Sequence, residues 1–203
     1  MSPIPPTPAA RIVAAAATGP EAVDAALAAA RLTTEDEGVV AELEAVAREA
    51  HALAHALAAA RTDPLTGLPH RGALAQAAPA DAVLAVDVDD LKATNDAHGH
   101  AAGDALLEAV ADRLREALRR GDAVYRTGGD EFTVLLGQTE PGAARAVAER
   151  LREAVAADTA ATVSIGVAIR RPGEAPERVR ERADAALYAA KAAGRDRVHA
   201  APE

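Results

Sequence analysis

Three carboxylates from two places in the sequence could together bind a divalent cation. Asp87 lies at the end of the apolar run 82–88, which is typical of a buried strand. Asp130 and Glu131 stand side by side in the stretch YRTGGDEFTVLL. Hard cations such as Mg²⁺ prefer oxygen ligands and usually take one or two carboxylates together with phosphate oxygens of a substrate. If the second segment pairs beside the run 82–88, the three acids converge near the carbonyl of Val88, and a bound cation would relieve their repulsion.

The two glycines before those acids also have a purely structural explanation. Gly128 and Gly129 suit a tight hairpin turn, because glycine adopts positive φ without steric cost. Acidic residues at the tip of such a turn can simply be solvated. The turn alone therefore does not decide between a cation site and a solvated loop.

Asn95, His100 and Asp104 are polar residues around an expected helix start in TNDAHGHAAGDALL. Asp104 near a helix N-terminus is stabilised by the helix dipole, which is a sufficient explanation for many such residues. Asn and Asp side chains together also offer the donors and acceptors that match a guanine edge. An Asp can accept hydrogen bonds from two neighbouring N–H groups of guanine, which adenine does not present.

The composition of the 203-residue chain limits its functions. Half of the residues are hydrophobic, but with one Phe, two Tyr and no Trp, packing must depend on close helix approach. The formal charge of −9 argues against binding to a nucleic-acid backbone. No apolar run approaches the roughly 20 residues that span a bilayer. The N-terminal sequence is a poor match to a signal peptide. Cysteine is absent. We therefore expect a soluble, cytoplasmic protein.

The first part of the chain is rich in proline and then in alanine. Residues 1–10 contain four prolines and are expected to be disordered or extended. Helix is expected over 11–31, with a break at TGP, where Thr18 could cap a helix that starts at Pro20.

A longer helix is expected before residue 63. Thr34 and Glu37 have capping-box spacing. The apolar residues that follow alternate steps of four and three, as in a heptad seam: Val39, Leu43, Val46, Ala50, Leu53, Leu57 and Ala60. The seam favours a regulatory or dimerisation segment over 11–62 that ends in a coiled-coil-like helix. An ordinary amphipathic helix lying on a domain would have a similar pattern.

Residues 63–203 alternate between helical and strand patterns. Strands are predicted at 82–88, 123–127, 132–136 and 161–169, and helices at 102–120, 141–157 and 176–194. The helix 102–120 has an apolar face made of Leu106, Val110, Leu114 and Leu118. Alternating helices and strands with one antiparallel hairpin predict an α/β domain with a mixed central sheet.

Five motifs in this segment carry a resemblance to one family. From about Asp63 to Val198, the sequence resembles GGDEF domains, the catalytic domains of diguanylate cyclases, through DPLTGLPHR, DVDDLKATNDAHGHAAGD, YRTGGDEF, VSIGVA and ADAALYAAKAAGR. The resemblance implies a fold like the palm of nucleotidyl cyclases. It also implies that two GTP molecules are joined into cyclic di-GMP with release of two pyrophosphates, with Mg²⁺ as cofactor and Mn²⁺ as the alternative ion. The sequence departs from the usual family motifs at His70, Asp90 and His98, but none of these positions is one that would bind the metal or the nucleotide.

The resemblance further implies a role for each matching residue. Asp87 and Asp130 would bind Mg²⁺ with the Val88 carbonyl, and Glu131 would bind a second metal ion or assist deprotonation of the attacking 3′-hydroxyl. At the nucleotide, Asn95 and Asp104 would recognise guanine, with His100 close by. The outer phosphates would be held by Lys191 and Arg195, with help from Lys92. The backbone would approach the phosphates closely at Gly128 and Gly129. Such phosphoryl transfer depends mainly on positioning and charge neutralisation.

Arg119 and Asp122 form an RxxD pattern shortly before the GGDEF stretch. The resemblance implies that this pair forms an inhibitory site for the product, with Arg150 as a secondary contact. An arginine at a helix end followed by a turn is the structural alternative.

The leading hypothesis is an active diguanylate cyclase working as a homodimer, because two half-sites that each hold one GTP must face each other. One alternative is a catalytically inactive module that binds GTP or cyclic di-GMP and signals through its N-terminal helices. Another is a nucleotidyl cyclase with a different base preference, against which Asp104 argues.

Overall fold

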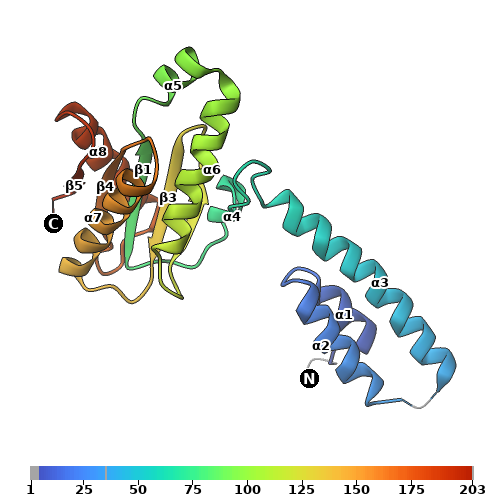
Figure 1. Ribbon diagram of the computed structural model, residues 1–203. Helices are drawn as coiled ribbons and strands as arrows, with labels where there is room; N and C mark the ends of the chain where they lie inside the picture. The colour runs from blue at the N-terminus through green and yellow to red at the C-terminus, as the bar shows by residue number, and fades with distance from the viewer. Residues whose placement is uncertain (1–4, 35, 203) are drawn as a thin grey trace. The chain divides into compact units, whose positions relative to one another are not determined.

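The computed structural model describes residues 5–34 and 36–202. The chain divides into two compact units, Met1–Arg61 and Thr62–Glu203 (Figure 1). Within the described residues, no helix combines the length and the apolar character needed to cross a bilayer.

The first unit consists of three helices, α1 (Pro8–Ala15), α2 (Pro20–Arg31) and α3 (Glu37–Ala60). Its core contains Ile12, Val23, Leu43 and five alanines, namely Ala16, Ala30, Ala47, Ala50 and Ala54. Such small side chains allow the helix axes to approach closely.

Three details at the helix starts differ from expectation. Residues 8–10, expected to be extended, are helical, because Thr7 Oγ1 accepts a hydrogen bond from the Ala10 amide (3.3 Å) and Pro8 suits a first helical position. Residues 1–4 lie outside the described residues. Gly19, not Thr18, is the cap of α2. At α3, the Asp36 carboxylate rather than Thr34 accepts from the amides of the first turn.

The apolar stripe of α3 has a different phase from the predicted seam. Leu43 and Ala50 are buried as expected, and Ala47 and Ala54 are buried with them. Val39 and Leu53 are exposed to 41% and 48%, and the side chain of Ala60 lies outside the description. The reason is that α3 packs against α1 and α2 of its own unit, which select the buried face.

The second unit contains a five-stranded sheet in the order β2-β3-β1-β4-β5. The central strand β1 (Ala82–Val88) is antiparallel to both β3 (Glu131–Leu136) and β4 (Val163–Ile169). The strand β2 (Ala123–Arg126) forms the expected hairpin with β3, and β5 (Val198–Ala200) is parallel to β4. The expected mixed α/β sheet is confirmed.

Helices cover both faces of this sheet (Figure 1). On one face, α6 (His100–Glu116) and α7 (Pro141–Asp158) pack on β1 residues such as Leu84 and Val86. On the other, α8 (Pro176–Ala192) and the short α4 (Arg71–Leu74) pack on Val83 and Ala85. Because side chains alternate along a strand, Asp87 lies on the α8 face.

The residue types explain which elements were missed or misplaced. The helix α5 (Leu91–His98) was not predicted, since Leu91 is its only buried residue; α4 and β5 were missed because they have four and three residues. The helix α6 begins at His100 and ends at Glu116, before the predicted end at residue 120. Within it, Val110 and Leu114 are fully buried as expected.

Candidate active site

The centre of the candidate site is a buried ion pair at the end of β1. Asp87 is 4% exposed, and its Oδ2 lies 2.7 Å from Nζ of Lys191 near the end of α8. Burial raises the pKa of Asp87 from 3.8 to about 6; Lys191 opposes this shift, and the charges of Asp130 and Glu131 add to it. A carboxylate with such repulsive neighbours is suited to a cation.

A glycine in β4 allows α8 to reach this position. A Cβ atom on Gly166 would lie 2.1 Å from the Ala183 carbonyl oxygen and 2.2 Å from the Leu187 nitrogen. Only glycine therefore fits where α8 crosses the strand. The close packing of α8 on the sheet brings Lys191 next to Asp87.

The hairpin carries the other two acids to the same end of the sheet. Glu131 pairs directly opposite Asp87, and the Val88 amide donates to the Asp130 carbonyl (3.0 Å). The expected pairing of the hairpin beside the first strand is confirmed, and Val88 lies with its backbone against the turn.

The hairpin glycines act differently from the expected turn geometry. Neither Gly128 nor Gly129 has a positive φ. Instead, a Cβ atom on Gly128 would lie 2.6 Å from Oε2 of Glu131, so Gly128 leaves room for that carboxylate, whereas Gly129 has open space around it.

The acids do not form a ready-made cage. In the part of the chain that the structure describes, no three Asp, Glu or His side chains are grouped closely enough to hold a metal ion by themselves. This arrangement still fits Mg²⁺, which commonly takes one or two carboxylates and completes its shell with water and phosphate oxygens. Asp87 and Asp130 could supply those carboxylates.

A surface groove of about 460 Å³ lies beside Asp130. Five residues predicted to contact the nucleotide or metal line it: Lys92, Asn95, His100, Gly129 and Asp130. Leu91 and Leu107 give it apolar walls. Such a mixture of apolar walls and a few polar groups is typical of small-molecule sites.

Asn95 has unused hydrogen-bonding capacity at this groove. Its Oδ1 is buried and has no hydrogen-bond partner among the described residues. The carboxamide packs on Gly103, where a Cβ atom would lie 1.9 Å from Oδ1. The next residue, Asp104, is exposed on α6 and does not line the groove.

Other predicted residues lie elsewhere around the site. Glu131 lines a separate cavity of about 460 Å³ between α4 and α8, together with Arg180 and Asp184. Arg195 lies beyond α8, with Nε 3.6 Å from Asp90 Oδ1. Adjacent acids Asp130 and Glu131 thus open onto different cavities.

The RxxD residues form a cluster with the end of α6. Arg119 Nη2 donates to the carbonyls of Gly137 (2.8 Å) and Gln138 (3.0 Å), and its Nε lies 3.5 Å from Asp122 Oδ2. The Arg119 side chain is 60% exposed, whereas that of Asp122 is 1% exposed and accepts from the Gly137 amide. Arg150 reaches the same helix end by donating to the Ala117 carbonyl (3.1 Å).

Sequence reasoning missed an ion pair that holds the hairpin tip. Arg126 Nη1 lies 2.9 Å from Asp63 Oδ1, and its Nη2 donates to the Gly129 carbonyl (2.7 Å). Burial raises the pKa of Asp63, but hydrogen bonds from Arg126 and Thr66 outweigh burial, so the pKa lies below its ordinary value. Asp63 lies in the motif DPLTGLPHR and Arg126 in the motif YRTGGDEF. Their presence in two motifs of the same family was the only sequence signal that could have pointed to this pair.

Comparison with protein families identifies the second unit. The model of the family described as "Diguanylate cyclase, GGDEF domain" matches residues 60–197, more than half of the chain. The chain belongs to the GGDEF family. Its GGDEF segment contains every element described above at the site.

Named relatives agree with this assignment. The GGDEF chain is 45% identical over 161 residues to diguanylate cyclase DgcP of Pseudomonas aeruginosa, covering 70% of this chain and 24% of the relative. It is 40% identical over 159 residues to diguanylate cyclase DgcM of Escherichia coli K12, covering 70% and 39%. The chain thus matches well under half of the length of these curated relatives.

Solved structures show the same GGDEF fold. The crystal structure of the coiled coil and GGDEF domain of DgcB from Caulobacter crescentus, in complex with c-di-GMP, gives a TM-score of 0.72 at 32% identity, covering 81% of this chain and 98% of that one. Diguanylate cyclase SiaD of Pseudomonas aeruginosa, solved with its activator SiaC, gives 0.66 at 37% identity, covering 81% and 71%.

Proposed function

We propose that this GGDEF chain is a Mg²⁺-dependent diguanylate cyclase that condenses two GTP molecules into cyclic di-GMP and two pyrophosphates. The observation that carries the proposal is that β1 and the β2–β3 hairpin bring Asp87, Asp130 and Glu131 to one end of the sheet, where Asp130 lines a nucleotide-sized groove. The names of its relatives support the reaction class.

In each condensation, the 3′-hydroxyl of one GTP forms a bond to the α-phosphorus of the other, and the bond to the β-phosphate oxygen breaks. Pyrophosphate leaves, and the hydroxyl proton passes to a base, for which Glu131 is our candidate. Mg²⁺ held by Asp87 and Asp130, with the Val88 carbonyl, would neutralise phosphate charge (Mn²⁺ has suitable ligand preferences too).

The remaining groups would bind and orient the nucleotide. Asn95 and Asp104 are assigned to guanine, with His100 beside the base and the groove walls around it. Lys191, Arg195 and Lys92 are assigned to the outer phosphates, where fixed cations stabilise charge. The backbone at Gly128 and Gly129 would lie along the triphosphate.

The proposal includes a homodimer in the cytoplasm, with residues 11–62 as its regulatory or dimerisation segment and 63–203 as the catalytic domain. The cyclic product needs two GTP molecules that attack each other, which a twofold arrangement of two sites supplies. The lack of cysteine fits a reducing compartment.

We also assign Arg119, Asp122 and Arg150 to an inhibitory product site. Their proximity at the end of α6 supports this assignment, since guanidinium groups pair well with phosphates and guanine edges.

The test is formation of cyclic di-GMP from GTP with Mg²⁺ by the full chain and by Asp130→Asn. We expect the variant to lose more than about 100-fold in kcat, because a ligand to the reacting centre is removed. Asp112→Asn, an exposed change on α6, is the matched control and should retain activity. Equal turnover by wild type and Asp130→Asn would refute the assignment, and binding without turnover by wild type would favour an inactive receptor.

Added cyclic di-GMP should inhibit wild type more than Arg119→Ala.

A further inference from the structure

The turn that carries Arg195 has an unfavourable backbone conformation. Arg195 and Asp196 have φ angles of +58° and +44°, directly after Gly194 at +113°. Two successive non-glycine residues in the left-handed region cost free energy, and such a conformation persists only where the surroundings enforce it. The contacts of this turn therefore identify what holds Arg195 in place.

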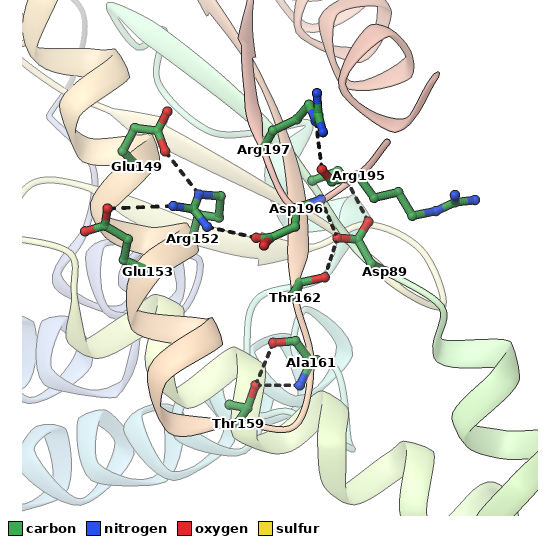
Figure 2. Close-up of polar contacts among 11 residues, drawn as sticks. Asp89, Glu149, Arg152, Glu153, Thr159, Ala161, Thr162, Arg195, Asp196 and Arg197 are labelled. Carbon is green, nitrogen blue, oxygen red and sulfur yellow. Dashed lines mark hydrogen bonds and ion pairs between the residues drawn. The ribbon is translucent and has the colours of Figure 1, made fainter. Parts of the chain in front are cut away.

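The first contact is a buried carboxylate that is not assigned to the metal or nucleotide. Asp89 is 7% exposed, and its Oδ2 accepts hydrogen bonds from the Asp196 amide (3.0 Å) and from Thr162 Oγ1 (2.8 Å). Its Oδ1 accepts from Ser164 Oγ (2.7 Å). One side chain thus joins the residue after β1, the start of β4 and the turn after α8 (Figure 2).

The second contact comes from α7. Arg152 Nη1 lies 2.9 Å from Asp196 Oδ1, and its Nε donates to Glu149 Oε2 (3.1 Å). Hydrogen bonds from Arg152 to Asp196 and Glu149 raise the pKa of this arginine above its ordinary value. The Arg152 side chain is only 21% exposed, so this ion pair is less screened by water than a fully exposed one.

These contacts are made by the Asp196 amide and the Asp196 side chain, and they do not involve the Arg195 side chain. Figure 2 shows the side chains of Arg195 and Asp196 extending in opposite directions from the turn. The Arg195 guanidinium is half exposed and lies beside Asp90, which directly follows Asp89 and caps α5. Neither Asp89 nor Arg152 lines the nucleotide groove.

We propose that Asp89 and Arg152 are positioning residues that hold the 194–197 turn so that Arg195 points its guanidinium at the outer phosphates of the bound nucleotide. This inference rests on the proposed function, because the phosphate role of Arg195 belongs to it. A disordered turn would let Arg195 adopt many directions, and part of the binding free energy would be lost in ordering it.

The first experiment measures amide hydrogen exchange in the 194–197 turn without any nucleotide. In Arg152→Gln, we expect the Asp196 amide to exchange its hydrogen at least about tenfold faster, because the ion pair that holds the Asp196 side chain is lost. Asp89→Asn should have a larger effect, and amides in β1 should be unchanged in Arg152→Gln. Arg113→Gln is the matched control, because Arg113, like Arg152, pairs with one carboxylate of its own helix and one of another element, but its partners lie outside this turn.

The second experiment measures GTP affinity by calorimetry with Mg²⁺, and KM and kcat where turnover occurs. Arg152→Gln should weaken GTP binding and raise KM about tenfold, with kcat within about twofold, as expected for lost uniform binding. Arg152→Lys should recover part of the loss. Arg195→Ala combined with Arg152→Gln should bind no more weakly than Arg195→Ala alone, because both act through one guanidinium.

Unchanged exchange at Asp196, or normal GTP binding by Arg152→Gln, would overturn the inference. Additive losses in the double variant would also overturn it, since they would assign Arg152 a general structural role. A wild-type chain that binds GTP without turnover would refute the cyclase proposal alone, because the binding comparison among variants would still test the positioning of Arg195.

Discussion

Asp87 combines near-complete burial with a negative charge, and this combination should be visible in the stability of the protein. The folded carboxyl group has a pKa of about 6, against 3.8 for its ordinary value. Between these values the folded protein holds a proton that the unfolded chain has already released. The free energy of unfolding therefore falls as pH rises through this window. Above about pH 6, the folded protein carries the full destabilisation of a buried, charged Asp87.

We predict that Asp87→Asn removes this pH dependence in the protein without nucleotide. Relative to wild type, the free energy of unfolding of the variant should rise by roughly 2 kcal/mol between pH 4 and pH 7. Denaturant unfolding at several pH values measures the difference. The control Asp112→Asn changes an exposed ion pair, which contributes little, and a parallel pH response of Asp87→Asn and wild type would contradict the prediction.

At the scale of elements, the site depends on how closely α8 lies on the sheet. We predict that Gly166→Ala lowers the free energy of unfolding by about 3 kcal/mol or more, because its Cβ atom would overlap the α8 backbone. The displaced helix would also draw Lys191 away from Asp87, so GTP binding should weaken in the fraction that folds.

The matched control for this change is Gly142→Ala in α7. Apart from the adjacent residues and the nearby backbone of α7 itself, no atom of the described residues lies within 4 Å of the Cβ position at Gly142, and its φ is not positive. This variant should be neutral or up to about 1 kcal/mol more stable, because alanine favours a helix over glycine. Thermal unfolding that ranks the two variants equally would show that the close approach at Gly166 has no energetic importance.

Elements with a strong periodic pattern were predictable from sequence, whereas long-range contacts were not. The run 82–88 has the same bounds as β1 because every residue in it is buried, and the hairpin strands follow from the apolar segments around the turn. The helix α5 has one buried residue and so no apolar period. Similarly, nothing local to Asp89 indicates that it binds an amide 107 residues away, and the role of Gly128 appears only when Glu131 is placed beside it.

At the scale of the whole molecule, the proposed reaction requires two chains. We predict that an excess of Asp130→Asn chain suppresses cyclic di-GMP formation by wild type in a mixture, since most wild-type chains would then have a partner unable to bind its metal normally. Formation of product per wild-type chain, measured at fixed wild-type concentration, gives the effect. The same excess of bovine serum albumin is the control for crowding, and an unchanged rate with both additions would indicate that one chain acts alone.

The salt bridge between Lys191 and Asp87 has a consequence for substrate affinity. The ammonium group already has a close anionic neighbour at 2.7 Å, so under the proposed function an incoming triphosphate would compete with that carboxylate for the Lys191 ammonium group. The contact that Lys191 would gain with phosphate is partly offset by the contact that it loses with Asp87. This exchange would limit the affinity for the nucleotide before the reaction starts. Modest ground-state affinity is advantageous for turnover, because interactions that strengthen only as the reaction proceeds accelerate it.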